Sequence, residues 1–163
     1  MPESWRSRVH RWAFNWFPAY RGTGARIEYL DDDWQEVRVR VPLNWRTRNY
    51  VGTIFGGSMY AAVDPIYMIM LIKRLGRAYE VWDKAASIRF RQPGRSTLFA
   101  RFRLDEAEVD SIRSEVSQAG RSERRYQIDL VDGDGTVCAI CEKVLSVRLR
   151  RSGGEEPRGL TRS

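Results

Sequence analysis

The segment from Thr53 to Leu75 is apolar at almost every position, and it limits what this chain can fold into more than any other feature. A helix that is hydrophobic on all sides must be buried on all sides, and a curved sheet wrapped around it would bury it in that way. Gly76 follows directly and is typical of a helix C-cap. The sequence therefore predicts a central, buried helix.

Alternating apolar and charged residues predict strands on both sides of this helix. The predicted strands cover residues 25–29, 37–41, 79–90, 97–104, 126–130 and 137–149. Before the last two strands, Asp105 is expected to cap a helix that has an apolar stripe (Val109, Ile112, Val116) and ends at Gly120. This order predicts one α+β domain, an antiparallel sheet wrapped around the long apolar helix.

The 163 residues fit one domain, with a body over residues 20–149 and a tail over 150–163 that we expect to be disordered. Residues 1–19 are expected to form an amphipathic helix, because Trp5, Val9, Trp12 and Trp16 recur at helical spacing, with arginines between them. This helix has two interpretations. It could be a lid that packs its tryptophans on the body, which we favour, or an anchor for a membrane surface.

The formal net charge of +7 favours anionic partners, among them phosphorylated cofactors, nucleic acid and acidic lipid. We do not expect nucleic-acid binding, because many arginines alternate with apolar residues along strands and no helix-turn-helix or stacking motif is present. Only Cys138, Cys141 and His10 could supply sulfur or imidazole ligands, so no metal is expected. With no uninterrupted apolar span, we expect no integral membrane segment and a cytoplasmic location.

One carboxylate, Asp64, lies inside the apolar segment, and it has two interpretations. It could cap a new helix whose first residue is Pro65. Alternatively, the helix begins at Gly56, Gly57 and Ser58, whose free amides could stabilise negative charge on a carbonyl oxygen. Asp64 would then lie two turns further along, where Pro65 interrupts one backbone hydrogen bond.

Two motifs resemble a known family. The pattern of Asn49, Gly52, Thr53, Phe55-Gly56-Gly57 and Asp64 resembles the loop and central helix of hotdog-fold acyl-CoA thioesterases of the phenylacetate-pathway type. The later run from Val81 to Phe90, followed by Pro93-Gly94, is similar to an uncharacterised thioesterase-like branch of that superfamily, a domain of unknown function. The resemblance covers about residues 20–149 and implies the hotdog fold.

The resemblance also implies a homodimer, which could pair into a tetramer, with active sites between the subunits. Gly57 would supply an oxyanion-type amide, and Asp64 of the facing subunit would act as general base or nucleophile, with Asn49 as a polar loop residue. The residues expected to bind substrate are Phe55, Gly56, Ser58, Arg89, Arg91 and Arg95, the arginines meeting the phosphates of coenzyme A. No cofactor is implied beyond the coenzyme A of the acyl-CoA substrate.

One position departs from the family. Characterised thioesterases usually carry histidine where this chain has Phe55. The leading hypothesis is therefore an acyl-CoA thioesterase, and the alternative is a non-catalytic hotdog protein that binds acyl-CoA or another acyl ligand. The neighbours Asp83 and Lys84 are interpreted as edge charges, although one of them could close a polar end of the acyl site.

Overall fold

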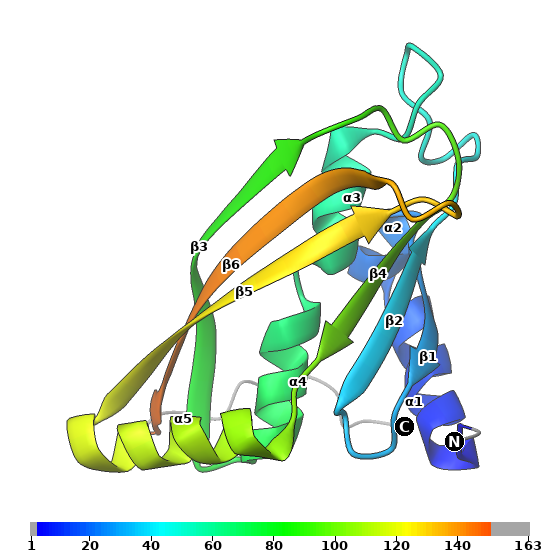
Figure 1. The fold of residues 1–163 in the computed structure, drawn as a ribbon. Helices are drawn as coiled ribbons and strands as arrows, with labels where there is room; N and C mark the ends of the chain where they lie inside the picture. The colour runs from blue at the N-terminus through cyan, green and yellow to red at the C-terminus, as the bar shows by residue number, and fades with distance from the viewer. Residues whose placement is uncertain (1–2, 151–163) are drawn as a thin grey trace.

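A single six-stranded sheet forms most of the molecule. The computed structural model describes residues 3–150. The strands are β1 (Arg26–Leu30), β2 (Glu36–Val41), β3 (Tyr79–Phe90), β4 (Leu98–Arg103), β5 (Arg121–Val131) and β6 (Val137–Leu149), and they lie in the order β1-β2-β4-β5-β6-β3. Every pair is antiparallel. The sheet curves strongly (Figure 1), which confirms the predicted α+β architecture.

The apolar segment forms two helices in succession, α3 (Gly56–Val63) and α4 (Ile66–Leu75), on the concave side of the sheet (Figure 1). Asp64 and Pro65 join them and keep right-handed helical dihedral angles. Burial of both helices against the sheet makes the core, to which Met59, Met70 and Leu71 contribute. The central helix therefore follows the prediction, with one interruption at the proline.

The helix predicted before the last two strands is α5 (Glu106–Ala119), which lies across one end of the sheet (Figure 1). The Asp105 side chain accepts a hydrogen bond from the amide of Glu108, and Gly120 ends the helix with a positive φ of 77°. The predicted apolar stripe is the buried face of α5. Local signals thus predicted this element correctly, including both of its ends.

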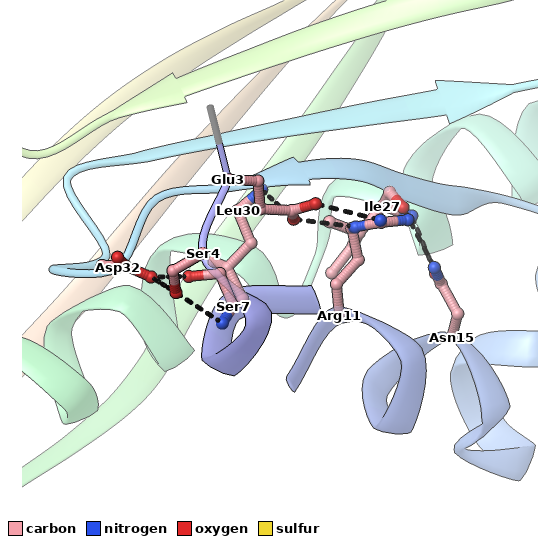
Figure 2. Close-up of polar contacts among 8 residues, drawn as sticks. All are labelled: Glu3, Ser4, Ser7, Arg11, Asn15, Ile27, Leu30 and Asp32. Carbon is pink, nitrogen blue, oxygen red and sulfur yellow. Dashed lines mark hydrogen bonds and ion pairs between the residues drawn. The ribbon is translucent and has the colours of Figure 1, made fainter. Parts of the chain in front are cut away.

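The N-terminal helices are α1 (Trp5–Trp16) and α2 (Pro18–Gly22), and α1 lies along the edge strand β1. Its polar side chains face the sheet (Figure 2). Asn15 accepts a hydrogen bond from the Ile27 amide (2.8 Å) and donates one to the Ile27 carbonyl (3.0 Å). Glu3 accepts from the Leu30 amide (3.2 Å) and pairs with Arg11.

The tryptophans of α1 point away from the body. Trp5, Trp12 and Trp16 are 73%, 62% and 52% exposed. The expectation that they pack on the body is wrong, because the face that meets the body carries Phe14 and the polar side chains, and the tryptophans lie on the opposite face. The tail expected over residues 150–163 lies outside the described residues except for Arg150, whose amide donates to the Ala78 carbonyl.

Candidate active site

Helix α3 begins with amides that its own turns cannot satisfy. Phe55 precedes the helix in an extended conformation and forms no side-chain cap. The first helical hydrogen bond runs from the Met59 amide to the Phe55 carbonyl (3.1 Å). The amides of Gly56, Gly57 and Ser58 therefore have no acceptor within the helix. They point outward from its N-terminus, the positive end of the helix dipole.

Aromatic rings lie against this first turn, which explains why two glycines stand there. A Cβ atom on Gly56 would lie 2.7 Å from the Phe90 ring, and one on Gly57 would lie 2.3 Å from the Phe55 ring. Both rings are largely exposed on their other side. The residue that replaces the expected histidine thus covers the Gly57 backbone with an apolar face, and it supplies no hydrogen-bonding group.

The loop before α3 is organised by Asn49. Its Oδ1 accepts hydrogen bonds from the amides of Val51 (3.1 Å) and Thr53 (3.0 Å), and its Nδ2 donates to the Thr53 hydroxyl (2.9 Å). Gly52, inside this turn, has a positive φ of 84°. Because both polar atoms of Asn49 hold the loop, the structure gives this residue a positioning role.

Asp64 belongs to a cluster of charges on the inner face of the sheet. Lys143 of β6 donates from Nζ to Asp64 Oδ1 (2.5 Å), and the Tyr60 hydroxyl donates to the same oxygen (2.7 Å). Lys143 also forms an ion pair with Asp83 Oδ1, 3.0 Å away. The lysine side chain is 1% exposed, whereas those of Asp64 and Asp83 are 40% and 27% exposed.

These contacts decide between the two interpretations of Asp64. A residue that caps a new helix has extended dihedral angles and binds the amides of the next turn. Asp64 instead has φ −49° and ψ −53°, and its side chain reaches Lys143 and Tyr60. Its other oxygen, Oδ2, has no hydrogen-bond partner within residues 3–150 and belongs to a partly exposed side chain.

Burial and charge shift the titration of the surrounding groups. Burial raises the pKa of the Asp83 carboxyl, and Lys143 offsets only part of this effect. Burial acts to lower the pKa of Lys143, but the hydrogen bonds and charges of Asp64 and Asp83 outweigh it, so that this pKa is raised. Burial and the hydrogen bond to Asp64 also raise the pKa of the Tyr60 hydroxyl. Lys143 is therefore a cation at neutral pH.

A β-bulge brings Asp83 to this cluster. In the register of β3 with β6, Asp83 lies opposite Leu145 and Ala85 lies opposite Val144, so that Lys84 is the extra residue. The bulge keeps Asp83 on the inner face with the buried lysine. Lys84 pairs instead with Glu123, and both of these side chains are well exposed.

The three arginines expected near coenzyme A are not equally placed. Phe90 touches the first turn of α3, so its neighbour Arg89 in β3 points to the other face of the sheet. Arg89 pairs there with Glu142 of β6 (2.8 Å). The structure therefore does not bring Arg89 to the helix terminus, because side chains alternate along a strand.

Arg91 and Arg95 are exposed and lie in the segment that follows β3. This segment touches the loop before α3, where the Ile54 amide donates to the Gly94 carbonyl (2.9 Å). A Cβ atom on Gly94 would lie 2.9 Å from the Met59 side chain of α3. Both arginines thus flank the segment that contacts the start of the helix.

Sequence reasoning missed Lys143 and Tyr60. Lys143 interrupts a run of inner-face residues in β6 that is otherwise apolar, Ala139, Cys141, Leu145 and Val147, and this charge within an alternating strand was a usable signal. Tyr60 precedes Asp64 by one helical turn, a spacing that puts both on one face of the helix.

Both cysteines of β6 are free and buried.

Gly57 and Asp64 of one chain cannot act on the same atom. They are seven residues apart along the helix, which corresponds to roughly 10 Å along its axis. A carbonyl oxygen within hydrogen-bonding distance of the Gly57 amide is therefore out of reach of Asp64 in the same chain. The two groups could meet at one substrate only if they came from different chains.

Comparison with known proteins identifies a family from the sequence and a fold from solved structures. A family model described as "Domain of unknown function (DUF4442)" matches residues 6–147. None of the curated proteins matches the chain. A Pseudomonas aeruginosa protein of unknown function, described as a probable thioesterase, superposes with a TM-score of 0.77 at 21% identity, over 88% of this chain and 95% of that one.

Two other solved structures are similar. A thioesterase from Haemophilus influenzae has a TM-score of 0.67 at 16% identity, covering 94% of this chain and 97% of that one. The PaaI protein of the Escherichia coli phenylacetic acid degradation operon has a TM-score of 0.59 at 15% identity, covering 90% and 93%. These likenesses show that the fold is the hotdog fold of thioesterase-like proteins, as the sequence motifs had indicated.

Proposed function

The chain belongs to the DUF4442 family, and from this membership and its hotdog fold we propose that it hydrolyses acyl-CoA thioesters. The observation that carries the proposal is that one helical segment holds both free amides, at the start of α3, and Asp64, a carboxylate bound on one oxygen and open on the other. Acyl transfer to water needs one group to take a proton and another to stabilise an oxyanion.

The proposed reaction uses two subunits. The thioester carbonyl accepts a hydrogen bond from the Gly57 amide, next to Gly56 and Ser58. Asp64 of the partner subunit takes a proton from water through Oδ2 as the water oxygen attacks the carbonyl carbon. The tetrahedral oxyanion then collapses, the carbon–sulfur bond breaks, and the coenzyme A thiolate leaves and takes up the proton.

The neighbouring residues have supporting roles in this proposal. Lys143 and Tyr60 hold Asp64 Oδ1 and so aim Oδ2 outward. The Phe55 ring offers an apolar face to the acyl group, and Asn49 fixes the loop that carries it. Arg91 and Arg95 meet the phosphates of coenzyme A, as guanidinium groups commonly do.

The proposal requires a homodimer, because the amide and the base are roughly 10 Å apart in one chain. Edge strand β3 could supply the contact by pairing with β3 of a second copy. The cytoplasmic location and the further pairing of dimers into a tetramer stay predictions.

A second candidate keeps the fold and the ligand but has no chemistry. Phe55 stands where thioesterases usually carry histidine, and it brings no polar group to the oxyanion site. A protein that only binds acyl-CoA would need the apolar face and the arginines, and it would not need Asp64 as a base.

The test is release of free coenzyme A from short, medium, long and aromatic acyl-CoAs. We expect Asp64→Asn and Asp64→Ala to lower kcat by about 100-fold or more, the usual contribution of a general base. Asp83→Asn is the matched control, because it breaks an ion pair to the same lysine without touching Asp64. We expect it to keep at least about a tenth of native turnover.

Three outcomes separate the alternatives. Turnover that survives in Asp64→Asn would refute the assigned base. Equal losses in the Asp64 and Asp83 variants would assign the effect to the cluster as a whole. No turnover on any acyl-CoA, with the same ligands raising the melting temperature, would leave a binding protein.

A further inference from the structure

The exposed face of α1 is not explained by thioester hydrolysis. Trp5, Val9, Trp12 and Trp16 form one stripe at helical spacing, and all four are at least half exposed. The opposite face meets the body: Phe14 packs against Tyr20, Ser7 donates to Asp32 in the turn after β1, and Asn15 bonds the backbone of Ile27 in β1 (Figure 2). The helix therefore directs its tryptophan stripe outward, although burial of that stripe would remove more hydrophobic area from water. An exposed aromatic patch of this kind marks an interaction surface.

Cationic side chains surround this stripe. A hollow of about 590 Å³ between α1 and strands β1 and β2 is lined by Trp12 and Trp16 together with Arg8, Arg11, Arg26 and Arg40. A second hollow of about 540 Å³ shares Trp16 and adds Trp45, Arg21 and Arg46. The Arg21 guanidinium lies over the Trp16 ring, 4.5 Å from its centroid.

The charges of the patch favour an anionic partner. Glu28 is the acidic residue that lines the first hollow, and it is paired with Arg40 (3.1 Å). Glu3 likewise neutralises Arg11 (2.8 Å). Arg8, Arg21 and Arg46 lie on the outer side with the indoles. A second copy of this surface would bring arginines against arginines, so the face is unsuited to pairing with itself.

The aromatic geometry favours a lipid surface over nucleic acid. Single-stranded nucleic acid binds on aromatic rings that offer open faces to its bases. The Trp12 and Trp16 rings instead lean on each other, with centroids 5.8 Å apart and planes tilted by 42°, and Arg21 covers Trp16. Indoles flanked by arginines on an exposed helix match the headgroup region, where the rings sit among glycerol groups and the guanidinium groups meet phosphates.

We propose that the outward face of α1, with Trp45 and Arg46 beside it, docks the protein on the surface of an anionic bilayer. The attachment is peripheral, and no helix within residues 3–150 is long and apolar enough to cross a membrane. Helix α1 lies flat with Trp5, Trp12 and Trp16 in the interface, while its hydrogen bonds to β1 hold the body above it. This role is independent of Asp64 and of any catalytic step.

The test uses the full chain with vesicles of phosphatidylcholine alone and vesicles that also contain phosphatidylglycerol. We expect flotation with the anionic vesicles, a blue shift of tryptophan emission, and weaker binding as salt rises. The variant Trp12→Ala/Trp16→Ala should reduce partitioning by about tenfold or more. Because both side chains are exposed, its melting temperature should remain close to that of the native protein; Trp5→Ala is a milder second variant.

Two double variants with the same change of charge test whether vesicle binding depends on the face of α1 or only on the net charge of the protein. Arg8→Glu/Arg21→Glu and Arg103→Glu/Arg125→Glu change the charge equally. The second pair lies on β4 and β5, which β1 and β2 separate from α1 in the order of the sheet. Only the first pair should lose vesicle binding. Equal losses, or no binding to anionic vesicles, would overturn the proposal. So would binding of a single-stranded oligonucleotide without vesicle binding, or a lipid-free oligomer that the tryptophan variant dissociates.

Discussion

The buried cation Lys143 is paired with two carboxylates, those of Asp64 and Asp83. Its ammonium lies 2.5 Å from Asp64 and 3.0 Å from Asp83, so removal of the lysine alone would leave two partly buried anions facing each other. Breaking a fully buried ion pair costs about 3–5 kcal/mol, and partial exposure of both carboxylates reduces this figure. We therefore expect Lys143→Met to lower the free energy of unfolding by about 2–3 kcal/mol in urea titrations at pH 7.

The pH dependence of this variant tests the same contacts. Burial raises the pKa of Asp83, so the proton binds more tightly in the folded state, and ionisation of Asp83 opposes folding as the pH rises. Without Lys143 this effect is larger. The stability deficit of Lys143→Met should hence be greatest near neutral pH and shrink as the pH falls toward the ordinary carboxyl range. The triple variant with Asp64→Asn and Asp83→Asn should recover most of it; a deficit independent of pH in the single variant would contradict the electrostatic cause.

At the scale of elements, the break between α3 and α4 has one cause. Pro65 has no amide hydrogen, so the Ala61 carbonyl loses its helical partner, although the backbone stays helical. The buried Tyr20 hydroxyl binds the next carbonyl, that of Ala62 (3.1 Å). The chain thus keeps a continuous helical path across a locally weakened point, beside the residue proposed as base.

Restoring the missing hydrogen bond should stabilise the protein. Proline in a helix interior costs about 3 kcal/mol of stability. Because proline also restricts the unfolded chain, it offsets up to about 1 kcal/mol of this cost. We expect Pro65→Ala to raise the free energy of unfolding by about 1–2 kcal/mol in urea. The new amide at position 65 should be protected in hydrogen exchange. A less stable variant would show that the proline ring contributes packing that exceeds the missing bond.

Helix α5 could be predicted from the sequence because the residues that determine it are close together in the chain. The cap of Asp105, the stripe of α5 and the end at Gly120 all lie within sixteen residues of one another, and each acts through neighbouring backbone. The cluster around Asp64 did not follow, because Lys143 is 79 positions away and Asp83 reaches it only through a bulge at Lys84. Helical spacing also revealed two faces of α1 without revealing which one meets the sheet.

At the scale of the molecule, the two edges of the sheet differ in whether another element covers them. Helix α1 covers the β1 edge, where Asn15 and Glu3 bind the backbone of Ile27 and Leu30. At the other edge, β3 pairs with β6 on one side, and no other strand within residues 3–150 pairs with it. An edge strand with unpaired backbone groups readily pairs with another chain. We therefore expect a homodimer in which two β3 strands meet.

Prolines in β3 can test this edge without a change of charge. Successive residues of a strand direct their amides to opposite neighbours, so of Ala86 and Ser87, both exposed, one serves β6 and the other serves the open edge. We expect sedimentation velocity to show a native dimer. One of Ala86→Pro and Ser87→Pro should be a folded monomer, and the other should be destabilised.

The folded monomer then separates the two proposals of function. Gly57 and Asp64 of one chain cannot reach one carbonyl, so coenzyme A release should fall with the dimer, whereas α1 lies at the far edge and should still bring each chain to anionic vesicles. A monomeric native protein that hydrolyses acyl-CoA, or a monomeric variant with full turnover, would refute the shared site. Loss of vesicle binding in the monomer would instead mean that two α1 faces must engage the bilayer together.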